Sequence, residues 1–96
     1  MRKSFAHNEV ITGANQELCA GSEKRVGLRF IPGILTGSVV IAPFAVTSLT
    51  SGANAVSLGQ SGPLTYEADG TVIMKPWFAF GSSVGDNILV IETLEG

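Results

Sequence analysis

The chain has 96 residues, the size of a single domain, and its 45% hydrophobic content is typical of a globular fold. Only 15% of its residues are charged, against about 25% in ordinary soluble domains, which favours a subunit whose surface is largely covered by neighbours. A net charge of −2 argues against a nucleic-acid partner, the single cysteine excludes an internal disulfide, and no apolar run approaches the length of a membrane span.

The N-terminal segment, residues 1–8, combines Arg2 and Lys3 with polar residues and lacks the apolar stretch of a secretory signal. We therefore expect no signal peptide there. Within a single β-sandwich domain spanning residues 1–96, we interpret this segment as a flexible or partner-binding arm.

Short runs of β-branched and aromatic residues occupy most of the chain, and Gly, Ser and Thr separate them every few residues. Strand candidates lie at residues 9–12, 16–19, 24–32, 38–43, 44–50, 55–58, 64–67, 71–80 and 87–94. No window repeats apolar residues at the spacing of a helix. The pattern predicts an all-β fold, a compact antiparallel sandwich or jelly-roll-like barrel of about eight short strands with no substantial helix.

The candidate strand at 24–32 carries half of the basic residues of the chain. Because side chains alternate between the two faces of a strand, one face takes three apolar residues that we expect in the core: Val26, Leu28 and Phe30. Arg25 and Arg29 then point outward. Together with Lys24, they are candidate partner-binding residues.

No charged residue occurs between Arg29 and Glu67. Free sheet edges ordinarily carry lysine, other charges or bulges that prevent unwanted pairing. A tract of this length with so many turns cannot lie wholly in the interior. We therefore expect part of it to lie in an interface with another chain, the alternative being a bland exposed surface.

Aromatic residues concentrate in the segment 75–81, KPWFAFG. Alternation places Trp77 and Ala79 on one face, and Phe78 and Phe80 on the other. One pair belongs to the core. The other is an interface anchor or a stacking platform for a sugar or base, and Trp77 is the candidate partner-binding residue.

The closing strand, 87–94, is apolar on both faces as far as Ile91. Ile88 and Val90 alternate with Leu89 and Ile91. A strand of this kind is typically buried on both sides. We expect the core on one side, and another element or another chain on the other.

Residues 81–85, GSSVG, match the G-x-S-x-G pattern of serine hydrolases. That motif requires a strand-to-helix turn and a histidine later in the chain, whereas here a strand follows Ser83 and the sole histidine, His7, precedes it. We interpret the segment as a turn between two strands and expect no catalytic residue.

Metal ligands are sparse. His7 and Cys19 are the only residues of their types, and Asp69 and Asp86 each adjoin a glycine, as in turns. Zinc requires three or four ligands, and calcium requires more oxygens than these. We therefore expect no metal and no cofactor, and we interpret Cys19 as a small buried apolar group.

Taken in order, TGANQELCAGSEKRVGLRFIP, SVVIAP, VSLGQSGPLTYE and GDNILVIE resemble the strands of small β-sandwich virion proteins of tailed bacteriophages, over residues 10–92. The turn IPGILTG differs from the Asn-rich turn of many such proteins. The resemblance implies a structural virion protein rather than an enzyme, foremost a capsid decoration (cement) protein that stabilises the head lattice. It also implies a homo-oligomer, assembled in the host cytoplasm and located in the virion, with the major capsid protein or another virion protein as partner.

Two alternatives stay open. The chain is either such a decoration protein, or a tail- or fibre-associated adaptor or host-glycan-binding module that uses Trp77 or Tyr66 as a stacking platform. Binding to a glycan array distinguishes a glycan module from a purely structural subunit.

Overall fold

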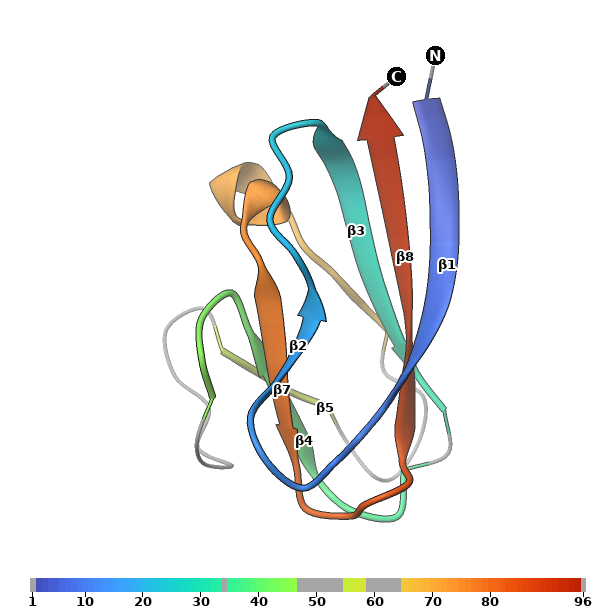
Figure 1. Cartoon of the computed structure of the whole chain (residues 1–96), viewed down its shortest axis with the longest axis vertical. Coiled ribbons are helices and arrows are strands. Elements are labelled where there is room, and N and C mark those ends of the chain that lie inside the picture. The colour runs from blue at the N-terminus through green and yellow to red at the C-terminus, as the bar shows by residue number, and fades with distance from the viewer. Residues whose placement is uncertain (1, 34, 47–54, 59–64, 96) are drawn as a thin grey trace.

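The computed structural model describes residues 2–33, 35–46, 55–58 and 65–95. Across these residues, eight strands form two four-stranded antiparallel sheets that face each other, which confirms the predicted β-sandwich (Figure 1). The first sheet has the order β1 (Arg2–Val10), β8 (Asn87–Glu95), β3 (Arg25–Pro32), β6 (Tyr66–Glu67). The second has the order β2 (Gln16–Cys19), β7 (Trp77–Gly81), β4 (Val39–Ala42), β5 (Val56–Leu58).

Residues 2–8 are not a free arm but belong to β1, which pairs with β8 along its whole length from Arg2 opposite Glu95 to Val10 opposite Asn87. The two termini consequently lie side by side at one end of the sandwich (Figure 1). β1 is the edge strand of its sheet.

The expected strand at 71–80 is wrong in its first half. Residues Gly70–Met74 form a short 3-10 helix, η1, and β7 begins only at Trp77. Pro76 explains the boundary, because proline has no N–H to donate to a sheet. Of the expected strand at 44–50, residues 44–46 are not in a strand, and 47–50 lie outside the described residues.

The core lies between the sheets, and three aromatic rings form its centre. The Trp77 ring packs 5.0 Å from Phe30 and 5.8 Å from Tyr66, measured between centroids. Trp77 is completely buried, and its Nε1 donates to the Val72 carbonyl at 2.9 Å. The expectation that Trp77 meets a partner is therefore wrong, because its ring fills the core and its only polar side-chain group is already bonded.

A β-bulge changes the alternation at the start of β3. From Phe30 opposite Val90 to Gly27 opposite Thr93 the pairing with β8 is regular, but the next paired residue is Arg25, opposite Leu94. The extra residue, Val26, shifts every preceding side chain to the opposite face. Leu28 and Phe30 lie in the core as predicted, whereas Val26 is 37% exposed and Arg25 only 1% exposed. The predicted outward position of Arg25 is therefore wrong.

The uncharged tract passes through β4, where all four residues are buried. Val39 and Ile41 point into the main core. On the other side of the second sheet, a smaller apolar cluster consists of Val40, Ala42 and Val46, with Ala55, Phe78 and Phe80 packed against it. Part of the tract is thus interior, and its expected role in an interface stays a prediction.

Candidate functional site

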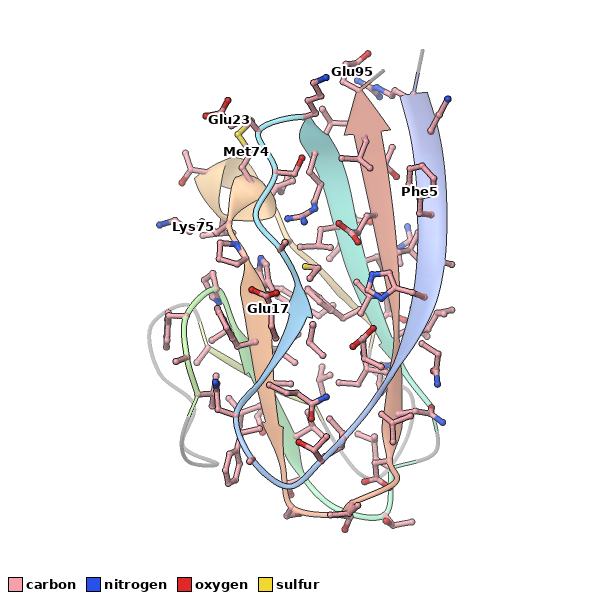
Figure 2. The ribbon with its side chains drawn as sticks, in the orientation of Figure 1. Phe5, Glu17, Glu23, Met74, Lys75 and Glu95 are labelled. Carbon is pink, nitrogen blue, oxygen red and sulfur yellow. The ribbon has the colours of Figure 1, made fainter. Side chains whose placement is uncertain are left out.

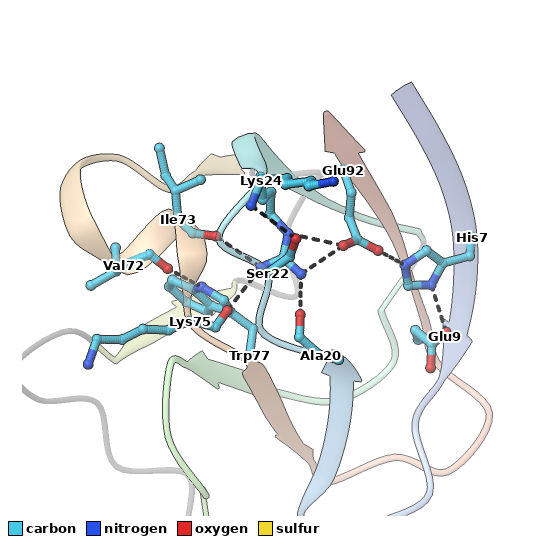
Figure 3. A network of polar contacts seen from close by, with 11 residues as sticks. His7, Glu9, Ala20, Ser22, Lys24, Val72, Ile73, Lys75, Trp77 and Glu92 are labelled. Carbon is cyan, nitrogen blue, oxygen red and sulfur yellow. Dashed lines mark hydrogen bonds and ion pairs between the residues drawn. The ribbon is translucent and has the colours of Figure 1, made fainter. Parts of the chain in front are cut away.

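Arg25 is buried and bonds to several groups of a polar network, whose members Ala20, Ile73, Lys75 and Glu92 are labelled in Figure 3. Glu92 Oε1 accepts from Nε at 3.0 Å and from Nη2 at 2.8 Å. Nη1 donates to the carbonyls of Ile73 and Lys75 at 2.9 and 3.0 Å, and Nη2 also donates to the carbonyl of Ala20. A guanidinium has five N–H groups, and these bonds use all of them. Arg25 therefore joins β3 to β8, to η1 and the residue that follows it, and to the residue that follows β2, and it has no donor left for a partner.

The same network continues to β1 through His7. Its Nε2 lies 2.8 Å from the second oxygen of Glu92, and its Nδ1 lies 2.8 Å from Glu9 Oε2. Partial burial disfavours the charged ring, but the hydrogen bonds to the two carboxylates outweigh it and raise the pKa of His7 above 6.5. Only the imidazolium can donate from both nitrogens, so the network contains two cations and two anions when His7 is protonated.

A second carboxylate organises the turn after β3. Asp86 accepts from the backbone N–H of Thr36 and Gly37 at 3.0 Å, and from the Thr36 hydroxyl at 2.8 Å. The backbone bond from Thr36 is the main cause that lowers the pKa of Asp86, and burial opposes it. Asp86 is thus a structural residue that ties the turn before β4 to the start of β8.

The candidate nucleophiles are not arranged for catalysis. Ser83 lies in the turn joining β7 to β8, as predicted, and both ring nitrogens of His7 already face carboxylates. Cys19 is buried, as predicted, and burial raises the pKa of its thiol to about 11. A thiol of this kind is a poor nucleophile at neutral pH.

Among the residues that the structure describes, no group of three or more His, Cys, Asp or Glu side chains is placed to hold a metal ion. Within the same part of the chain, no helix has the length and apolarity needed to cross a membrane.

The four residues predicted to bind a partner do not share a face. Arg25 and Trp77 lie inside the sandwich. Arg29 points outward, as predicted, and pairs with Glu67 of β6 at 3.0 Å, with both side chains at least half exposed. Lys24 is exposed in the turn before β3. Of the four, Arg29 and Lys24 are therefore accessible.

The structure presents another surface, the side of the first sheet that faces away from the second. We call it the outer face. At its centre lie two half-buried residues of β8. Leu89 lies between Ile31 of β3 and Asn8 of β1, and Ile91 lies between Arg29 of β3 and Ala6 of β1. Val10, opposite Asn87 on the same face, is 51% exposed. The two-sided apolar pattern of 87–94 already indicated this surface, because one side of β8 is core and the other is not covered by the second sheet.

Polar pairs border the outer face. Arg29 and Glu67 form an exposed ion pair on one side, and the hydroxyls of Ser4 and Thr93 lie 3.0 Å apart near the chain termini. An apolar centre with a polar border is the usual composition of a protein–protein contact surface. Comparison of the chain with family models, curated proteins and solved structures found no match.

Proposed function

We propose that the chain is a non-catalytic structural subunit that docks onto a protein lattice through the outer face. We further propose that the lattice is the head of a tailed bacteriophage, where the chain acts as a decoration protein and stabilises the capsid. The observation that supports docking is the apolar centre of the outer face, formed by Leu89, Ile91 and Ile31. The sequence resemblance supports the choice of lattice.

The position of these side chains favours binding. Ile91 and Leu89 project from β8, which has β1 on one side and β3 on the other. Strands paired on both sides hold their side chains rigidly, so docking requires little ordering of the chain. Apolar surface that is accessible on a rigid sheet often marks a site of association.

The glycan-binding alternative loses its aromatic platform. The Trp77 ring is buried, and Tyr66 packs against Trp77 and Phe30. A tail- or fibre-associated adaptor would use the same outer face, and differs from a decoration protein only in where the chain is found on the particle.

The test is to coexpress the chain with the major capsid protein encoded in the same genome, and to measure occupancy on purified heads by electron microscopy. Ile91→Lys introduces a charge at the centre of the outer face, and its aliphatic stem can lie along the sheet so that the fold survives. Val84→Lys, in the exposed turn between β7 and β8, is the matched control. We expect low occupancy for Ile91→Lys and normal occupancy for Val84→Lys. Full occupancy of folded Ile91→Lys would refute docking through the outer face.

A further inference from the structure

β1 is an unusual edge strand. The four sheet edges in the described part of the chain are β1, β6, β2 and β5, and β1 is nine residues long while the others have two to four. Seven of its nine residues are exposed. A long exposed edge offers its backbone N–H and C=O groups to another strand.

The hydrogen bonds at the end of β1 show which backbone groups point outward. Ile11 N–H donates to the Asp86 carbonyl at 2.7 Å, which continues the β1–β8 pairing by one residue. Along an antiparallel strand, alternate residues bond to the same neighbour, so the odd-numbered residues of β1 face β8. The carbonyl of Val10 instead accepts from the Gln16 side chain at 2.8 Å. The even-numbered residues Ser4, Ala6 and Asn8 therefore direct their N–H and C=O groups away from β8.

These directions restrict how a second copy could pair with β1. In a symmetric antiparallel pair, even-numbered residues must lie opposite even-numbered residues, so the two-fold axis passes through a residue rather than between two. An axis at Ala6 is the arrangement that overlaps the whole of Arg2–Val10. Ala6 then pairs with its own copy, and Ser4 pairs with Asn8 of the second copy, each pair exchanging two backbone hydrogen bonds.

The side chains select the same register. With the axis at Ala6, Lys3 lies beside Glu9 of the second copy, and Phe5 lies beside His7 of the second copy. Both are non-hydrogen-bonded pairs, in which side chains approach most closely. An axis at Phe5 would instead place Lys3 against His7, and an axis at His7 would place two histidines together. Both neighbouring registers thus bring like charges together when His7 is protonated.

We propose that two copies of the chain associate through β1, antiparallel about a two-fold axis at Ala6, and extend the first sheet across the dimer. Phe5 is 51% exposed on β1, and in Figure 2 it lies clear of the strands of the second sheet. The second copy would cover it. Because the axis is perpendicular to the sheet, the outer faces of both copies lie on the same side. The dimer does not depend on docking to a capsid.

The test is a charge exchange across the interface, measured as the dissociation constant by sedimentation velocity over a range of concentrations. Wild type should show a monomer–dimer equilibrium. Lys3→Glu and Glu9→Lys each convert two attractive pairs into two repulsive pairs, so we expect each variant alone to bind roughly 30-fold more weakly, or about 2 kcal/mol. An equimolar mixture should recover dimerisation, because glutamate then faces lysine in both pairs.

Two further variants distinguish this register from a general effect of net charge on association. Arg2→Glu makes the same change of charge as Lys3→Glu, but Arg2 would face Val10 of the second copy, so dimerisation should not change. Ala6→Pro removes an outward N–H without affecting the pairing with β8, so it should abolish the dimer. It tests the interface independently if Glu9→Lys does not fold. A wild-type chain that stays monomeric would overturn the proposal, as would a mixture that does not recover or an Arg2→Glu chain weakened like Lys3→Glu. These measurements contain no capsid protein, so they are independent of the docking experiment.

Discussion

Replacing Arg25 with leucine should be the most damaging change in the polar network. The substitution removes the donors to Glu92 Oε1 and to the carbonyls of Ala20, Ile73 and Lys75, and among the described side chains it leaves Glu92 only its contact with His7. Removing one partner of a buried ion pair costs about 3–5 kcal/mol, because the remaining charge is no longer compensated. The free energy of unfolding of a single domain is only about 5–15 kcal/mol, so Arg25→Leu should remove a large part of it.

The assay is urea unfolding followed by the fluorescence of Trp77, the only tryptophan, which is fully buried in the folded chain. In a thermal melt followed by the same fluorescence, the midpoint should fall by on the order of 20 °C. Arg29→Leu is the matched control, because Arg29 and Glu67 form an exposed pair whose loss should cost about 0.2–1 kcal/mol. If Arg25→Leu cost no more than Arg29→Leu, the network would not stabilise the fold and the reasoning would be wrong.

Three other properties should follow from the titrating groups. The stability contributed by His7 should be complete below pH 6.5 and be lost as pH rises through the raised pKa of His7. The urea midpoint of wild type should therefore fall as pH rises through that pKa, whereas the midpoint of His7→Gln should not. Asp86 has a lowered pKa, so its contribution to the free energy of unfolding should be present above the ordinary carboxylate pKa and be lost as pH falls through the lowered pKa. Asp86→Asn should lower the urea midpoint at pH 7, and the difference between its midpoint and that of wild type should disappear in acid. Cys19 should react with a thiol reagent only at the rate of unfolding at neutral pH, because its pKa is about 11 and it is buried; rapid reaction of the native chain would contradict this.

The strands that the sequence predicted best are those with one apolar face in the core. The expected strand at 16–19 has the bounds of β2, and those at 24–32 and 87–94 differ from β3 and β8 by one residue. Each contains residues that the core buries. In β3 and β8 these residues recur with a period of two, whereas in β2 the buried Leu18 and Cys19 are adjacent, at a bulge. β1 has no such pattern: apart from its last residues it was expected to be an arm, because most of its side chains are exposed and polar.

The main error in the candidate site concerns a pairing register, which residue types do not encode. Val26 is as apolar as Leu28, so simple alternation placed Val26 in the core and Arg25 outside. The bulge depends on how β3 meets β8, a strand far later in the chain, and only the structure reveals it. Trp77 was misassigned for another reason: alternation separates Trp77 from Phe78 but does not say which of them faces the core.

The bulge connects the interior of the sandwich to its exposed edge. By turning Arg25 inward it gives Glu92 a cationic partner, and Glu92 in turn holds His7 of β1 at 2.8 Å. β1 has a neighbouring strand on one side only, so this side-chain contact adds to the backbone bonds that keep it against β8. An edge strand that is already fixed pairs with a second chain at a lower entropic cost than a mobile one. The network therefore serves assembly indirectly: it contacts no partner, yet it fixes the strand through which we propose that two copies pair.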